Sequence, residues 1–147
     1  MSARSSFSRR AQTHRLANGC RLTTLPNPHA PTVTIAGTLS AGPALATDGR
    51  YSVPGLTAAM LDRGTVGFDR LGLARELEDH GLQMTVRAAS SSPTIISFSC
   101  QGLAEQLPRM VRLLSEVLRR PSFPQGELEK LREQVLGSLV REREETQ

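Results

Sequence analysis

Aromatic residues are scarce in this chain of 147 residues, which has one tyrosine, four phenylalanines and no tryptophan. A hydrophobic core must therefore be aliphatic, and the aromatic platforms on which single-stranded nucleic acids stack are not expected. Only two cysteines occur, too few for a disulfide framework or a cysteine metal cage. Cys20 and Cys100 lie in apolar, strand-like runs, so we expect both to be buried free thiols.

Long hydrophobic runs are also missing. No stretch approaches the roughly 18 apolar residues needed to span a bilayer, and the basic N-terminus is not followed by the apolar segment of a secretory signal. Its Arg- and Ser-rich start resembles a mitochondrial transit peptide, although a disordered polar tail is the commoner explanation. We expect a soluble cytoplasmic protein with a disordered basic tail at residues 1–13 and one ordered domain at 14–147.

Acidic residues are absent from the first 47 positions, which contain five arginines. The rest of the chain carries 13 basic and 14 acidic side chains, so the formal net charge of +4 originates in the N-terminal part. Seventeen of the 18 basic residues are arginines, scattered beside Glu and Asp instead of forming one stripe. A biased nucleotide composition explains this pattern. An Arg-rich nucleic-acid-binding module is an alternative that only the tail has the charge to support.

Turn and strand patterns predict the structure of the first part of the chain. The Asn18-Gly19 pair between two short apolar segments predicts a β-hairpin with a two-residue turn. Three prolines within residues 25–31 predict a connecting loop. Alternating apolar and polar residues over 32–39 predict a half-buried strand whose inner face includes Leu39.

Loops and helices are expected next. Glycine, alanine and proline are frequent in residues 41–55, which predicts a long irregular loop. A short helix is expected over 56–63. A second helix is expected over 69–80, because Asp69 is a suitable N-cap and Gly81 a suitable C-terminal stop.

The remaining sequence predicts two strands and two helices. Alternation over 82–88 and 94–101 predicts an antiparallel hairpin with its turn at 90–93. The helix expected over 103–118 has an apolar stripe of Leu103, Leu107, Met110, Val111, Leu114 and Val117. The last helix has a stripe of Leu128, Leu131, Val135 and Leu139. This order, with hairpins in place of crossovers, predicts an α+β fold in which helices cover one face of an antiparallel sheet.

The three histidines do not have the spacing of metal ligands. His14 begins a strand, His29 lies in the proline-rich loop, and His80 ends a helix, where its cation complements the helix dipole. None lies three or four positions from another, so a helical zinc pair is excluded. Glutamates of the last helix alternate with Lys and Arg, which indicates a solvated, salt-bridged face. The residues by themselves indicate no catalytic, cofactor-binding or metal-binding site.

Five segments, in this order along the chain, resemble the corresponding segments of a known protein family. They are Leu16–Leu22 (LANGCRL), Pro28–Val33 (PHAPTV), Pro54–Thr65 (PGLTAAMLDRGT), Phe98–Cys100 with the helix after it, and Pro121–Arg132 (PSFPQGELEKLR). From about Leu16 to its end, the chain resembles the insulinase and mitochondrial-processing-peptidase (M16-type) family of zinc metalloproteases. The resemblance implies the α+β metalloprotease fold of that family, with an incomplete N-terminal domain.

Active members of this family carry an H-x-x-E-H motif on one helix and a glutamate ligand on a later helix. The two histidines bind zinc, and the glutamate between them activates the metal-bound water. The resemblance places Gly55, Ala58 and Ala59 at the motif positions and Ser138 at the distal glutamate. None of these four supplies an imidazole, thiolate or carboxylate. The resemblance therefore implies a non-catalytic member with no catalytic residue, metal ligand or cofactor.

Non-catalytic subunits of this family pair with an active subunit and help to enclose a peptide. We therefore expect a hetero-oligomer with an active insulinase-like protease, a peptide as ligand, and no nucleic-acid or membrane partner. The resemblance also implies a truncated chain whose last helix lacks part of its packing partner. An alternative is a zinc-dependent endopeptidase with displaced ligands, such as His80 with nearby carboxylates.

Overall fold

The computed structural model describes residues 10–41, 52–88 and 94–145. The chain divides into two compact units, one ending at Pro31 and the other beginning at Thr32. Within the described ranges, no helix is long and apolar enough to cross a membrane. The turn expected at 90–93 and most of the loop expected at 41–55 lie outside the described residues.

The first unit contains a β-hairpin. Strand β1 (Gln12–Arg15) pairs antiparallel with β2 (Arg21–Thr24), and His14 lies opposite Leu22. The hairpin predicted from the Asn-Gly pair is confirmed, although β1 begins two residues before His14. The proline-rich segment 25–31 contains neither helix nor strand, as predicted.

The turn of this hairpin differs from the two-residue turn that we predicted. The Leu16 N–H donates to the Cys20 carbonyl over 2.8 Å, and the Gly19 N–H donates to the Leu16 carbonyl over 2.9 Å. Residues 17–19 therefore form a three-residue loop between the paired Leu16 and Cys20. Gly19 has a φ of 84°, the left-handed conformation that closes such a three-residue loop. The Asn18 side-chain oxygen stabilises the turn by accepting a hydrogen bond from the Cys20 N–H.

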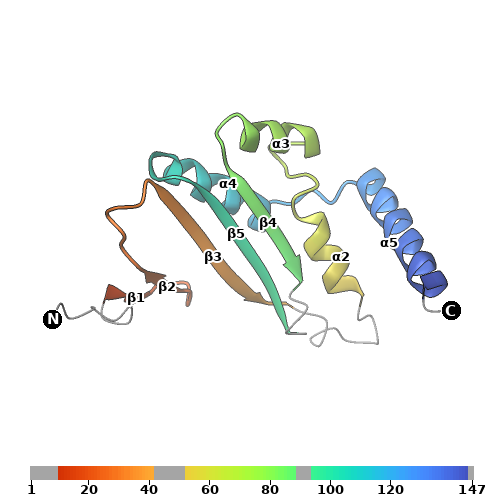
Figure 1. The fold of residues 1–147 in the computed structure, drawn as a ribbon, viewed down its shortest axis with the longest axis horizontal. Helices are drawn as coiled ribbons and strands as arrows, with labels where there is room; N and C mark the ends of the chain where they lie inside the picture. The colour runs from red at the N-terminus through yellow and green to blue at the C-terminus, as the bar shows by residue number, and fades with distance from the viewer. Residues whose placement is uncertain (1–9, 42–51, 89–93, 146–147) are drawn as a thin grey trace. The chain divides into compact units, whose positions relative to one another are not determined.

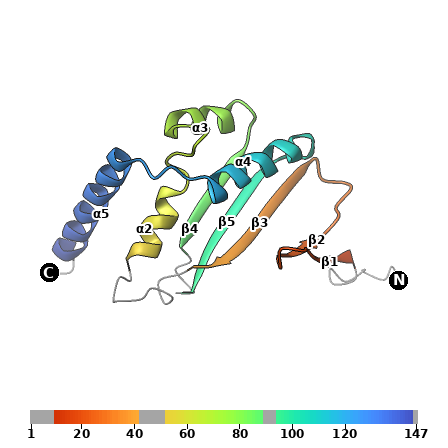
Figure 2. The same ribbon diagram turned by 180° about the vertical axis from the view of Figure 1, so that it is seen from behind.

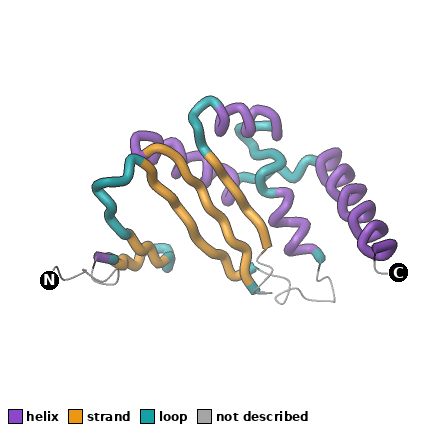
Figure 3. Tube along the Cα trace, in the orientation of Figure 1, coloured by secondary structure: helices purple, strands orange, loops and turns teal. Residues whose placement is uncertain are grey.

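The second unit contains a three-stranded antiparallel sheet. Its strands are β3 (Thr32–Ser40), β4 (Gln83–Ala88) and β5 (Ile95–Leu103), with β5 in the centre (Figure 1, Figure 3). The register places Cys100 opposite Ile35 in one neighbour and Met84 in the other. All three predicted strands are confirmed, as is the antiparallel pairing of β4 with β5.

Side chains alternate between the two faces of this sheet. The inner face carries the apolar residues Val33, Ile35, Met84, Val86, Ile96, Phe98 and Cys100. Gly37 lies opposite Phe98, and a Cβ at Gly37 would come within 2.3 Å of the phenyl ring, so glycine makes room for the ring. Leu39 lies opposite Ile96 and therefore on the inner face, as predicted, but it is 40% exposed because it lies near the end of an edge strand with one neighbour only.

Four α-helices occur in the described residues: α2 (Val53–Met60), α3 (Arg70–Glu78), α4 (Leu107–Arg119) and α5 (Gln125–Glu145). A short 3₁₀ helix, η2 (Ala104–Gln106), precedes α4. Helix α2 begins three residues before the predicted Leu56, because Pro54 is accommodated in its first turn. Helix α4 begins later than predicted, because Leu103 still pairs with Thr32 of β3 at the end of β5.

Helix α3 has the two ends that its sequence predicts. The Asp69 carboxylate accepts a hydrogen bond of 2.6 Å from the Gly72 N–H at the first turn. Gly81 adopts a φ of 60° just beyond the last turn. The helix itself ends at Glu78, two residues before the predicted His80.

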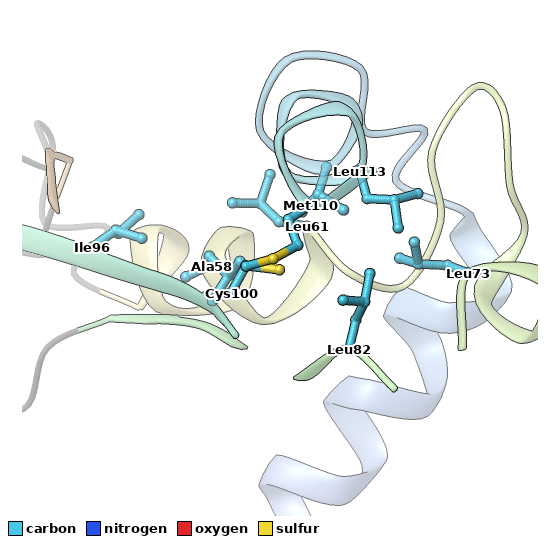
Figure 4. Packing of buried hydrophobic residues seen from close by; sticks show 10 residues of the cluster. Ala58, Leu61, Leu73, Leu82, Ile96, Cys100, Met110 and Leu113 are labelled. Atoms are coloured by element: carbon cyan, nitrogen blue, oxygen red, sulfur yellow. The ribbon is translucent and has the colours of Figure 1, made fainter. Parts of the chain in front are cut away.

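The core lies between the inner face of the sheet and three helices, and Figure 2 shows α4 crossing this face. Its helical and connecting members are Ala58, Leu61, Leu73, Leu82, Met110, Leu113 and Val117 (Figure 4). Leu113 is fully buried, whereas Val111, which we predicted in the stripe, is 53% exposed. The buried residues of α4 follow the i, i+3, i+4, i+7 spacing from Met110, so Leu113 takes the place of Val111 in the buried stripe.

Helix α5 buries little of its apolar stripe. Leu131 is 6% exposed, but Val135 and Leu139 are 39% and 55% exposed. Leu136 and Val140 beside them are 60% and 58% exposed. We call these four exposed residues the α5 row. In the part of the chain that the structure describes, these four apolar side chains are exposed, and the expectation that the stripe lacks part of its packing partner stays a prediction.

The two cysteines differ in exposure. Cys100 is buried as predicted, but Cys20 is exposed, which corrects our expectation, because it belongs to a hairpin whose two strands are exposed along their whole length. Burial raises the pKa of the Cys100 thiol, so its reactive thiolate is disfavoured. A chromogenic disulfide reagent should therefore modify one thiol rapidly and the other only after unfolding. Cys20→Ser should abolish the rapid phase, and rapid labelling of that variant would contradict the buried position of Cys100.

Candidate functional site

The candidate site is the part of α2 that the family resemblance assigns to zinc binding. Ala58 is fully buried in the core cluster, so its methyl group packs against apolar neighbours. Ala59 is partly buried and lines a hollow of about 390 Å³. Gly55 has open space around the position that a Cβ would occupy. A hydrogen atom and two methyl groups offer no lone pair to a metal ion.

Ser138, at the position of the distal glutamate, is partly buried on α5. Its hydroxyl donates a hydrogen bond of 2.8 Å to the Val135 carbonyl of the same helix. Such a bond to the preceding turn fixes the side chain against its own backbone. Ser138 therefore contributes to its helix and presents no carboxylate.

The structure does not gather the histidines into a metal site. His14 and His29 are exposed in the first unit. His80 follows α3, and its Nδ1 lies 2.9 Å from the Glu76 carbonyl oxygen, an interaction that anchors the ring to the end of the helix. Across the ranges that the structure describes, no group of three His, Cys, Asp or Glu side chains could hold a metal ion.

A polar network centred on Arg63 connects α2 with α5, and sequence reasoning missed it. Arg63 Nε donates to the Ala59 carbonyl over 3.1 Å, and Nη2 donates to Gln134 Oε1 over 3.3 Å. Arg63 Nη1 lies 3.6 Å from Glu127 Oε2 and is a buried nitrogen without a hydrogen-bond partner among the described atoms. The arginine therefore links α2, where the resemblance places the zinc motif, with α5, where it places the distal glutamate.

Glu127 is the anionic centre of this network. Its carboxylate lies 3.2 Å from Arg70 Nη1 and 2.8 Å from Lys130 Nζ, in addition to Arg63. Only the Lys130 pair has helical spacing, so only that pair agrees with the salt-bridged face that we predicted for the last helix. The side chains of Arg63 and Glu127 are 15% and 14% exposed, so this pair is largely shielded from water.

Apolar and charged residues both line the hollow beside Ala59. The apolar ones are Leu73, Ala74, Leu77, Met84 and Val86, and the charged ones are Asp62, Arg63 and Arg70. This lining offers apolar contact and ion pairing next to the residue that the resemblance places at the second histidine of the zinc motif.

The Glu127 pKa gives a test of the network. The hydrogen bond from Lys130 lowers this pKa, and the charges of Arg70 and Arg63 add to the effect, outweighing partial desolvation. A lowered pKa means that the carboxylate stabilises the fold above its unfolded pKa of about 4.3, and that this stabilisation is lost as the pH falls through the folded pKa. Glu127→Gln should therefore lower the free energy of unfolding at neutral pH, by an amount that shrinks below about pH 4.

Urea unfolding of the wild type and of Glu127→Gln, at neutral pH and below about pH 4, measures this difference in the free energy of unfolding. Glu129→Gln is the matched control, because Glu129 lies on the same helix and accepts a hydrogen bond from the neutral Gln125 amide. The control should change stability little at either pH. An equal loss in both variants, or a loss for Glu127→Gln that persists in acid, would contradict the network.

The fold defines a class of protein: an α+β domain in which helices cover one face of a three-stranded antiparallel sheet. The model of the Insulinase (Peptidase family M16) family matches residues 21–147. The chain therefore belongs to the insulinase family, as the five sequence segments suggested. No curated protein sequence matches the chain significantly.

Two solved structures share this fold. The inactive domain of a peptidase M16 from Pseudomonas fluorescens matches with a TM-score of 0.82 and 24% identity, over 90% of this chain and 32% of that chain. The periplasmic protease PqqL from Escherichia coli matches with a TM-score of 0.76 and 13% identity, over 99% of this chain and 16% of that chain. The chain thus spans less than a third of either relative.

Proposed function

We propose that this protein is a non-catalytic insulinase-family member that acts as the partner subunit of an active metalloprotease. The observation that supports the proposal is the composition of α2, in which the family resemblance places Gly55, Ala58 and Ala59 at the zinc-motif positions. The helix packs with Ala58 in the core, and none of these three residues has a side chain that binds metal. A domain that keeps the fold without the ligands is suited to association and peptide enclosure rather than to hydrolysis.

Metal analysis tests the non-catalytic part of this proposal. The purified chain, incubated with zinc and then desalted, should retain no stoichiometric zinc and should not cleave peptides. His80→Ala should leave both results unchanged, because that imidazole is anchored to the Glu76 carbonyl. Stoichiometric zinc together with chelator-sensitive peptide cleavage would overturn the proposal and favour a protease with displaced ligands.

The α5 row is the surface that we assign to the association. It places four apolar side chains, each at least 39% exposed, within six positions of one helix. In both solved relatives the matching part is less than a third of the chain, so further polypeptide accompanies this part of the fold there. We propose that the active partner supplies the corresponding contacts.

Binding to a family member that carries H-x-x-E-H tests this surface. Replacing Leu136 and Leu139 together by lysine should weaken the association by tenfold or more, since about 1.4 kcal/mol of lost apolar burial corresponds to that factor. Leu71→Lys is the matched control, because Leu71 is 65% exposed on α3. A monodisperse monomer that ignores such a partner, or equal weakening by the control, would contradict the proposal.

The cytoplasmic location stays a prediction. PqqL is a periplasmic protease, so the family fold itself occurs outside the cytoplasm. Cell fractionation should recover this chain with cytoplasmic markers, and recovery in a periplasmic fraction would contradict the prediction.

A further inference from the structure

The hairpin of the first unit brings two arginines together without a counter-charge. The register of β1 and β2 places Arg15 directly opposite Arg21, and both residues are exposed. Like charges at directly opposed positions destabilise a strand pair. An anion bound by both guanidinium groups would relieve this repulsion.

The described residues of the first unit include no acidic side chain that could balance these two charges. Residues 1–47 contain no aspartate or glutamate, and neither Arg15 nor Arg21 forms an ion pair with a residue that the structure describes. On the same face of the hairpin, Thr13 and Thr23 lie opposite each other with their hydroxyl oxygens 3.0 Å apart. This face therefore combines two guanidinium groups with hydroxyl groups.

A hollow lies over this face. Its volume is about 430 Å³, and it is lined by Thr13, Arg15, Gly19 and Arg21. Gly19, in its left-handed conformation, places no side chain over the hollow, and apart from its two chain neighbours no described residue comes within 4 Å of the position that a Cβ would occupy. A small anion can therefore reach both guanidinium groups from the side of the turn.

We propose that this hollow binds a phosphate dianion, either free or as a phosphomonoester group. The two guanidinium groups match its charge and its several acceptor oxygens, and arginine pairs with phosphate through two parallel hydrogen bonds. A nucleic-acid phosphodiester carries a single charge, and the described part of this unit has no aromatic side chain for base stacking. This binding site is independent of the proposed partner-subunit function.

Titration of the full chain with inorganic phosphate at constant ionic strength, followed by backbone amide NMR, tests the site. We expect saturable shifts at Arg15, Gly19 and Arg21. The double variant Arg15→Gln, Arg21→Gln should weaken binding by tenfold or more, because charge-assisted hydrogen bonds are lost. The variant relieves the like-charge pair, so loss of the hairpin is not a confounding result, and the amide spectrum verifies that it persists.

Arg87→Gln is the matched control, since Arg87 is an exposed strand arginine of the second unit. It should leave phosphate binding unchanged. A phosphoserine peptide binding more tightly than inorganic phosphate assigns the site to phosphorylated chains, and the reverse order assigns it to free phosphate; either result supports the proposal. Absence of saturable shifts, equal weakening by Arg87→Gln, or preference for a DNA duplex over both phosphate ligands would overturn it.

Discussion

Ala58→Glu should destabilise the fold strongly rather than restore a catalytic base. Ala58 is fully buried in the same cluster as Cys100 and Met110 (Figure 4). A carboxylate at this position would be buried among apolar groups without a charged partner, which costs about 3 kcal/mol or more. We expect the free energy of unfolding, measured by urea titration at neutral pH, to fall by that amount.

Ala59→Glu is the matched control on the next residue of α2. Ala59 lines the same hollow as Arg63 and Arg70, so a carboxylate there has positive charge within reach. We expect its stability to stay within about 0.5 kcal/mol of the wild type. Similar losses in both variants would show that α2 does not bury Ala58 in the way the structure indicates.

Leu113→Ala should give the second large effect. Leu113 is fully buried on the face of α4 that packs against the sheet. Truncating a buried leucine removes apolar burial and leaves a cavity, which costs roughly 2 to 5 kcal/mol. Thermal and urea unfolding should both record this loss.

Val111→Ala tests whether the observed or the predicted set of α4 residues forms the buried stripe. Val111 is 53% exposed, so its truncation should change stability by less than about 0.5 kcal/mol. A larger loss of stability for Val111→Ala than for Leu113→Ala would contradict the observed orientation of α4 and favour the stripe predicted from the sequence.

Most elements of the second unit follow from signals between neighbouring residues. The Asp69 cap and the left-handed Gly81 fix the ends of α3, and both depend on a few adjacent backbone groups. Alternation in β4 and β5 predicted which side chains face the core, because strand geometry fixes that choice once one face is buried. These features are local, so the sequence was sufficient for them.

Features that depend on distant residues were predicted less well. Leu103 fits the apolar stripe of a helix, but its pairing with Thr32 keeps it in β5 and delays the start of α4. Cys20 lies in an apolar run, but the hairpin that contains it buries neither of its strands. Tertiary pairing and packing, which the local pattern does not contain, decided both cases.

The candidate site depended on two kinds of information. Counting residue types and spacings indicated no metal site, and only the family resemblance placed Gly55, Ala58, Ala59 and Ser138 at former ligand positions. The Arg63 network could not be predicted from either source, because Arg63 and Gln134 are 71 positions apart. A single arginine after a helix gives no signal of the distant helix that it will contact.

The zinc content of a complex with an active family member tests the central claim most directly. We predict a complex with one copy of each chain and one zinc ion, and loss of that zinc when the H-x-x-E-H motif of the partner is replaced by alanines. Zinc that remains after this replacement, or failure of the two chains to form a complex, would contradict the assignment of this protein as a non-catalytic partner subunit.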